Sequence, residues 1–150
     1  MLALESISDL PVVAFSGGEE IIQQGSRPEK LFFLKSGKVE VVREDIRVSL
    51  IKTPGSVLGE LSLLLEIDAT ATVRALEDAT LFVSDHPLNY LKAHPEVHLH
   101  VSKALAYRLN AASRYLVDVK EQLKDCSDHV GKVDGVIDAI INKDLKKKIA

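Results

Sequence analysis

The stretch that decides the fold spans residues 59–75 and reads GELSLLLEIDATATVRA. Its first part places four leucines within the five positions 61–65, which is too apolar for an exposed loop. We therefore expect one short helix whose N-terminus lies at Gly59 to Leu61. The free backbone N–H groups at such a helix end can bind an anion, although a Gly-Glu start is by itself a weak signal.

Short apolar or alternating segments lie on both sides of this helix, and turns rich in glycine, proline or serine separate them. The expected strands are 12–15, 20–24, 31–34, 38–43, 46–51, 70–75 and 80–84. In the strand at 70–75, alternation places Ala71, Val73 and Ala75 toward the core and Arg74 on the other face. Short strands at this spacing predict an antiparallel sandwich or barrel.

Proline and glycine divide the chain unevenly. All five prolines and six of the eight glycines lie between residues 10 and 95. Because proline breaks helices, this asymmetry predicts a turn-rich β domain at 1–94 followed by a helical segment at 95–150.

Composition excludes several classes of protein. A chain of 150 residues, 46% hydrophobic and 27% charged, fits one globular domain. Nineteen Lys and Arg against 22 Asp and Glu give a net charge of −3, the wrong sign for a domain that grips a nucleic acid backbone. No apolar run approaches the roughly 18–20 residues of a membrane helix, and MLALESISDL is not a signal peptide, so we expect a cytoplasmic protein. The single cysteine, Cys126, excludes an internal disulfide and any multi-cysteine zinc site.

The C-terminal segment carries a heptad repeat. From residue 105 onward the apolar positions advance by alternating steps of four and three residues without a slip. They are Leu105, Leu109, Ala112, Leu116, Val119, Leu123, Cys126, Val130, Val133, Ile137 and Ile140. A helix packed on its own domain drifts from such a seam, so the pattern predicts a long helix that associates as a coiled coil of two or four chains.

An ordinary surface helix or a helical hairpin stays open as the alternative for this segment. Gly131 and Gly135 each cost about 1 kcal/mol inside a helix. They allow a break near 125–128, with Ser127 or Asp128 as the N-cap of a new helix.

Several motifs share the spacing of one known family. They are Phe15-x-Gly17-Gly18-Glu19-x-Ile21, Gly25, Leu31-Phe32-x-Leu34-x-Ser36-Gly37-x-Val39-x-Val41, Gly55-x-x-x-Gly59-Glu60-Leu61-Ser62-Leu63-Leu64 and Ala71-Thr72-Val73-x-Ala75. Over about residues 10–125 the chain thereby resembles the cyclic-nucleotide-binding domain family. The resemblance implies a mainly β fold with C-terminal α: an eight-stranded antiparallel jelly-roll barrel, a short phosphate-cassette helix and a long association helix.

The resemblance also implies a ligand cassette between Gly59 and Val73. In it Glu60 would accept a hydrogen bond from the ribose 2′-hydroxyl, and backbone N–H groups would face the cyclic phosphate. The implied ligand-binding residues are Gly59, Glu60, Leu61, Ser62, Ala69, Thr70 and Ala71. The base would be capped from the association helix, with Asn110, Ser113 and Arg114 as candidates.

The cassette departs from the family at Asp68 and Ala69. The family carries Pro-Arg or a similar pair there, and the arginine pairs with the phosphate. Deleting one partner of a buried charge pair costs about 2–5 kcal/mol, or about 30- to several-thousand-fold in affinity. Arg74 is the nearest basic residue in sequence, but alternation turns it outward. We therefore expect a pocket that no longer binds cyclic nucleotides tightly: it binds a cyclic nucleotide or another small ligand weakly, or it has lost that role and the barrel serves assembly. A functional cyclic AMP or cyclic GMP sensor is the alternative.

The C-terminus departs as well. Transcription factors of this family add a winged helix-turn-helix, and residues 126–150 are too few to form one. The basic cluster of Lys143 and 146–148 is typical of a solvated helix end. We expect a homo-oligomer, with another regulatory protein as a further candidate partner, and neither direct DNA binding nor membrane association.

No metal centre or catalytic group is expected. His94 and His98 stand four positions apart, but Pro95 lies between them and no third ligand is evident. No histidine precedes His86, which argues against a metal-dependent enzyme of the cupin type, the remaining alternative. The sequence thus predicts a non-enzymatic regulatory, ligand-sensing module with no cofactor beyond a candidate cyclic nucleotide ligand.

Overall fold

The computed structural model describes residues 2–124 and 127–140 of the chain. Two compact units divide it, the first spanning residues 1–104 and the second residues 105–150. Helix α3, Pro95–Gln122, begins at the boundary expected between residues 94 and 95. The division between the two units falls within that helix.

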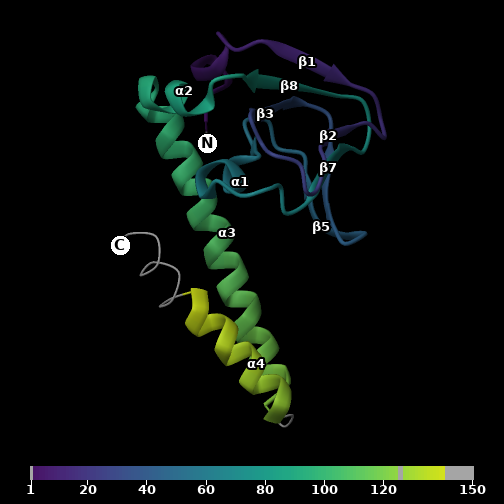
Figure 1. Cartoon of the computed structure of the whole chain (residues 1–150), viewed down its shortest axis with the longest axis vertical. Helices are drawn as coiled ribbons and strands as arrows, with labels where there is room; N and C mark the ends of the chain where they lie inside the picture. The colour runs from purple at the N-terminus through teal and green to yellow at the C-terminus, as the bar shows by residue number, and fades with distance from the viewer. Residues whose placement is uncertain (1, 125–126, 141–150) are drawn as a thin grey trace. The chain divides into compact units, whose positions relative to one another are not determined.

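The first unit holds two four-stranded sheets in the orders β1-β8-β3-β6 and β2-β7-β4-β5 (Figure 1), and all neighbouring strands are antiparallel. The strands are β1 Val12–Phe15, β2 Glu20–Ile22, β3 Leu31–Ser36, β4 Val39–Arg43, β5 Ile46–Ile51, β6 Val57–Leu58, β7 Thr72–Ala75 and β8 Ala79–Ser84. The expected mainly β fold with eight antiparallel strands is confirmed. Strand β6 alone was not expected, because two residues are too few to show a period.

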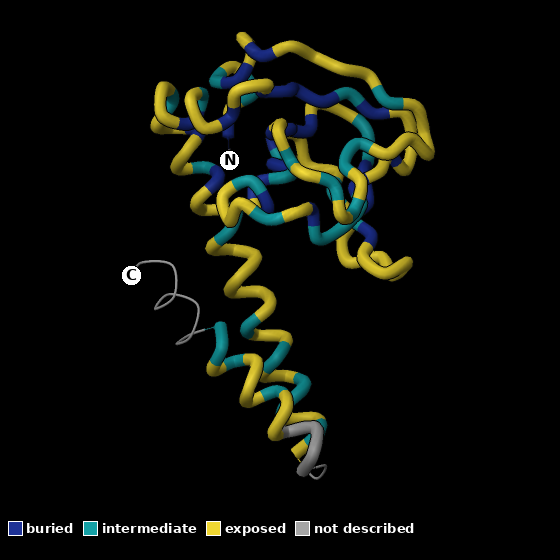
Figure 2. The backbone as a smooth tube through the Cα atoms, viewed as in Figure 1, coloured by how far each residue is buried: buried dark blue, intermediate teal, exposed yellow. Residues whose placement is uncertain are grey.

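The core of this unit lies between the two sheets. It joins Phe32 and Leu34 of β3 to Val39 of β4 and to Val73 and Ala75 of β7, all of them buried. Strands β3 and β8 are buried along most of their length (Figure 2), so they are covered on both faces. The expected core-facing positions of β7 are therefore correct at its two most buried residues.

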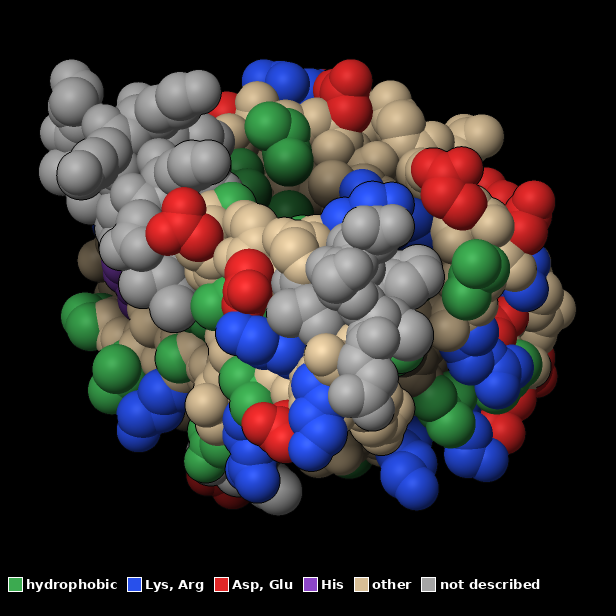
Figure 3. Space-filling view, turned by 90° about the horizontal axis from the view of Figure 1, so that it is seen from below, with side chains coloured by type: hydrophobic (Ala, Val, Ile, Leu, Met, Phe, Trp, Pro, Cys, Tyr) green, Lys and Arg blue, Asp and Glu red, His purple; other side chains and the backbone are tan. Residues whose placement is uncertain are grey.

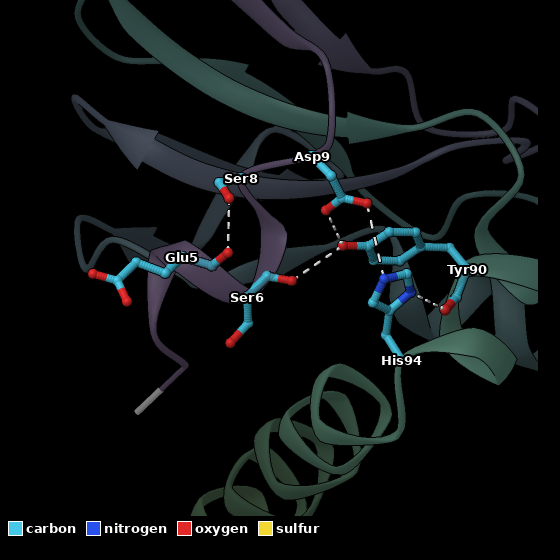
Figure 4. Close-up of polar contacts among 6 residues, drawn as sticks. All are labelled: Glu5, Ser6, Ser8, Asp9, Tyr90 and His94. Atoms are coloured by element: carbon cyan, nitrogen blue, oxygen red, sulfur yellow. Dashed lines mark hydrogen bonds and ion pairs between the residues drawn. The ribbon is translucent and has the colours of Figure 1, made fainter.

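A polar cluster ties the N-terminus to the helices that follow β8 (Figure 4). It joins the 3-10 helix η1, Leu4–Ile7, and the residues after it to helix α2, Pro87–Ala93. The Tyr90 hydroxyl donates to Asp9 Oδ1 at 3.0 Å and contacts the Ser6 carbonyl oxygen at 3.3 Å. Burial and the neighbouring Asp9 carboxylate raise the pKa of the Tyr90 hydroxyl, which therefore stays protonated as a donor.

His94 belongs to the same cluster and follows the last residue of α2. Its ring stacks on Tyr90 with 4.0 Å between ring centroids, and its Nε2 lies 3.8 Å from an Asp9 carboxylate oxygen. Because α3 begins at the next residue, Pro95, His94 and His98 do not share a face of one helix. His94 thus has a structural role at the junction of two helices.

In the second unit, α3 continues to Gln122 and α4 spans Ser127–Asp138. The Lys120 ammonium of α3 donates to the Asp134 carboxylate of α4, so the two helices lie antiparallel as a hairpin (Figure 1). The sequence left a break between two helices open near this position, and within the chain the structure shows the hairpin that was kept as the alternative. Association of the seam between chains stays a prediction. A heptad seam can be satisfied within one chain when the helix breaks, because the apolar residues then pack against the second helix of the same chain.

The hairpin uses part of the predicted seam. The half-buried seam residues are Leu105, Leu116, Val119, Leu123, Val133, Ile137 and Ile140. Leu109 and Ala112 are exposed, whereas Cys126 and the side chain of Val130 lie outside the described part of the chain. No side chain described in this unit is fully buried (Figure 2). Within the described ranges, no helix has the length and apolar character needed to cross a membrane.

Candidate functional site

Helix α1, Glu60–Leu65, begins where the sequence predicts, with Gly59 as its N-cap. Gly59 has a φ of 89°, in the left-handed region that favours glycine. A Cβ at this position would lie 3.2 Å from Ile22 Cδ1 and 3.4 Å from the Lys30 carbonyl oxygen. Glycine therefore lets α1 start directly against the end of β2 and the segment before β3.

The buried residues of α1 are polar, and most of its leucines are exposed. Glu60 and Ser62 are only 3% and 6% exposed, whereas Leu61, Leu64 and Leu65 are 42%, 39% and 42% exposed. Apolar packing alone would bury the leucines and leave Glu60 in solvent. A buried carboxylate costs free energy unless it is paired or hydrogen-bonded. The helix thus turns two of the predicted ligand residues, Glu60 and Ser62, away from solvent.

Ala69 lies in the link between α1 and β7 and is 6% exposed. Its N–H donates to the Ser26 carbonyl oxygen at 2.8 Å, and its carbonyl oxygen accepts from the Gly25 N–H at 2.7 Å. The Gln24 N–H donates to Thr72 Oγ1 at 3.0 Å. These three hydrogen bonds hold the turn after β2 against the end of the cassette.

The same turn carries Arg27 to the cassette. Its Nη1 donates to the Glu66 carbonyl oxygen at 3.2 Å and lies 3.8 Å from Asp68 Oδ1. The side chains of Arg27 and Asp68 are 62% and 66% exposed. A cation that the sequence pattern does not predict therefore lies beside the cassette. Arg27 precedes Glu66 by 39 positions, and no local pattern connects its Gly-Ser-Arg-Pro turn to α1.

Arg74, by contrast, is engaged on the outer face of the second sheet, as its alternation predicts. Its Nε lies 2.5 Å from Glu40 Oε1, and Arg47 Nε lies 2.7 Å from Glu40 Oε2. The Arg74 and Arg47 guanidiniums hold the pKa of the Glu40 carboxyl below its usual range. Arg74 is therefore committed to Glu40 rather than to the cassette.

A cavity of about 220 Å³ lies beside the turn that carries Arg27. Residues 21–23, 26–30 and Phe32 line it. None of the predicted ligand residues of the cassette takes part in its lining.

The predicted cassette residues lie in one continuous segment of the chain, residues 59–71. Gly59, Glu60, Leu61 and Ser62 form the first turn of α1, and Ala69, Thr70 and Ala71 form the link to β7. The Ile67 N–H donates to the Ser62 carbonyl oxygen at 3.1 Å. This hydrogen bond forms the turn that ends α1 and leads into the link. The candidate base-cap residues Asn110, Ser113 and Arg114 belong to the second unit, and their role stays a prediction.

A family model described as cyclic nucleotide-binding domain matches residues 12–87. The chain belongs to the cyclic nucleotide-binding domain family. It is 37% identical to the cGMP-dependent protein kinase egl-4 of Caenorhabditis briggsae over 68 residues, which cover 45% of this chain and 9% of that kinase. The chain therefore spans under a tenth of the length of that relative, and the kinase activity lies outside what the match covers.

Solved structures of this family share the fold. The catabolite activator protein of Thermus thermophilus superposes with a TM-score of 0.67 at 28% identity, over 77% of this chain and 57% of that one. The regulatory subunit of a cAMP-independent protein kinase A from Trypanosoma cruzi, bound to guanosine, superposes with a TM-score of 0.51 at 25% identity. That match covers 57% of this chain and 30% of the regulatory subunit. Among residues 2–124 and 127–140, no group of three metal-ligating side chains lies close enough to hold an ion.

Proposed function

We propose that this chain is a non-enzymatic regulatory module that senses a small ligand of nucleoside type in the cassette 59–71. The Glu60 carboxylate would accept hydrogen bonds from the ribose hydroxyls, since an ionised carboxylate offers several lone pairs beyond those used by any one partner. Ser62 and Thr70 supply further polar contacts, and no bond of the ligand needs to be broken.

The observation that carries this proposal is Ala69. Its methyl side chain supplies no charge at the position where the family places the phosphate-binding arginine. Its backbone N–H and carbonyl group are both used in holding the turn after β2, at 2.8 and 2.7 Å. Loss of one charged partner costs about 2–5 kcal/mol, so we expect a cyclic nucleotide to bind weakly.

A ligand without a phosphate is known for one structural relative of this chain. The Trypanosoma cruzi regulatory subunit is cAMP-independent and is bound to guanosine, at 25% identity to this chain. A domain of this fold can therefore hold a nucleoside. We extend that ligand class to the present cassette because both its charge and its buried carboxylate suit it.

Tight sensing of a cyclic nucleotide is the second candidate, and the likeness to the cGMP-dependent kinase favours it. Calorimetric titration of the purified chain with cyclic AMP, cyclic GMP, adenosine and guanosine separates the two. A Kd of about 10 μM or tighter for either cyclic nucleotide would establish the second candidate. Weaker binding of both cyclic nucleotides, with measurable binding of a nucleoside, is the result we expect.

We propose that the module passes ligand occupancy on through association of its helices. Leu109, a predicted seam residue, is 52% exposed, and Tyr115 on the same helix is 69% exposed. Apolar side chains this exposed are suited to a partner helix, such as that of a second copy or of another regulatory protein. Contacts from Asn110, Ser113 and Arg114 to the base would then couple binding to association, because a ligand shifts an equilibrium only through differential contacts.

The proposal places this module in the cytoplasm without catalysis or direct DNA binding. The net charge of −3 opposes binding to a nucleic acid backbone, and acidic and basic side chains are interspersed on the face shown in Figure 3. Elemental analysis of protein purified without chelator tests the remaining enzyme alternative. A stoichiometric bound metal would favour a cupin-like enzyme over a sensor.

A further inference from the structure

We propose that Asp68 determines the charge of the ligand: by pairing with Arg27 it reserves the cassette for an uncharged nucleoside and disfavours anions. This inference rests on the proposed function, because it concerns the selectivity of the same cassette. It adds two residues, Asp68 and Arg27, to those that the site was expected to use.

The backbone brings the two residues together. The N–H and carbonyl group of Ala69 bond to Ser26 and Gly25, so the turn bearing Arg27 is fixed beside the residue that follows Asp68. The Arg27 guanidinium reaches both the Glu66 carbonyl oxygen, at 3.2 Å, and Asp68 Oδ1, at 3.8 Å. Arg27 thus stands at the end of the cassette that lacks its own cation.

The cassette segment carries acidic side chains and no basic one. Within residues 59–71 the ionisable side chains are the carboxylates of Glu60, Glu66 and Asp68, with no basic residue among them. Arg27 is a cation that the structure places beside the Asp68 carboxylate, whose charge matches its own. The Arg27–Asp68 pair therefore offers no net positive charge to an added phosphate, whereas an uncharged ligand needs none.

A single substitution at Asp68 would remove the ion pair that Arg27 makes. Both side chains are more than half exposed, and ion pairs at such positions are weak and exchange with solvent. Without the Asp68 carboxylate, the guanidinium would be free to turn toward a bound phosphate, where a charge-assisted hydrogen bond is stronger than one to a carbonyl oxygen. Asp68 therefore acts against anionic ligands mainly by its own charge and, more weakly, by competing with them for Arg27.

The test compares cyclic GMP and guanosine, and cyclic AMP and adenosine, by calorimetric titration of four forms of the full chain. These are the unsubstituted protein, Asp68→Asn, Asp68→Asn with Arg27→Gln, and Glu29→Gln. The last is the matched control, since Glu29 is an exposed carboxylate of the same turn. Circular dichroism confirms that each variant is folded, which we expect because all three positions are exposed.

We expect the unsubstituted chain to bind a nucleoside at least about tenfold more tightly than its cyclic nucleotide. Asp68→Asn should tighten cyclic nucleotide binding about three- to tenfold and leave nucleoside binding unchanged. This increase in cyclic nucleotide affinity should be lost in the double variant and absent in Glu29→Gln. It should also become smaller as salt is added.

Two other outcomes are distinguishable. If a cyclic nucleotide binds more tightly than the nucleoside, or if Asp68→Asn leaves their ratio unchanged, the role of Asp68 is refuted while the sensor function stands. If neither nucleosides nor cyclic nucleotides bind any form of the chain, the proposed function fails, and this inference fails with it.

Discussion

At the scale of single residues, two buried carboxylates occupy different settings. Glu40 is 4% exposed and is held by the Arg74 and Arg47 guanidiniums, so its charge is fully matched on the outside of a sheet. Glu60, 3% exposed, belongs to a cassette without a basic residue. The first arrangement stabilises the fold. For Glu60 we propose that lone pairs beyond those its own contacts use accept ligand hydroxyl groups.

Glu40 gives a prediction about pH. Because its pKa is lower in the folded chain than the ordinary value of 4.5, its contribution is fully present above that value and is lost as the pH falls through the folded-state pKa. Urea unfolding measured from neutral to acidic pH should show Glu40→Gln less stable at neutral pH, with the difference shrinking in acid. Glu77→Gln removes an exposed pair with Lys38 and should show a smaller difference. Equal effects of the two substitutions across pH would contradict the assignment.

At the scale of elements, the local sequence pattern predicts a strand or helix correctly wherever the periodicity of its apolar residues determines the structure. The alternation in 70–75 gave the buried positions of β7, and the Gly-Glu-Leu start located α1. The local pattern does not predict the position of Arg27, because that position depends on hydrogen bonds between segments distant in sequence. Nor could the heptads distinguish a coiled coil from a hairpin, because a seam of apolar residues is satisfied by a partner helix in either chain.

The turn between β3 and β4 contains Gly37, where a side chain should destabilise the fold. Gly37 has a φ of 90°, and a Cβ there would lie 2.5 Å from the Asp78 carbonyl oxygen. Gly18 has a similar φ of 93° with nothing within 4 Å of such a Cβ. Gly18→Ala should therefore cost about 1 kcal/mol of stability, and Gly37→Ala about 3 kcal/mol or more. Chemical denaturation measures both, and equal losses would show that the turn tolerates a side chain.

At the scale of the whole molecule, the helical hairpin leaves part of the heptad seam exposed. Leu109 is 52% exposed on the seam, and Val117 is 50% exposed on α3 but off the seam. If the chain associates through the seam, Leu109→Glu should lower the molar mass measured by light scattering to that of a single chain. Val117→Glu should leave the assembly intact. Loss of assembly in both variants, or in neither, would mean that the seam is not the interface.

The ligand selectivity proposed for this chain depends on how the cassette responds to negative charge on the ligand. The most direct measurement is the calorimetric affinity for cyclic AMP and cyclic GMP after Ala69→Arg, with Ala69→Gln as an uncharged control for side-chain bulk. We predict that Ala69→Arg tightens binding of a cyclic nucleotide by about 30-fold or more, and that Ala69→Gln does not. A folded Ala69→Arg protein whose affinity is unchanged, or an unsubstituted chain that already binds at about 10 μM or tighter, would contradict the account.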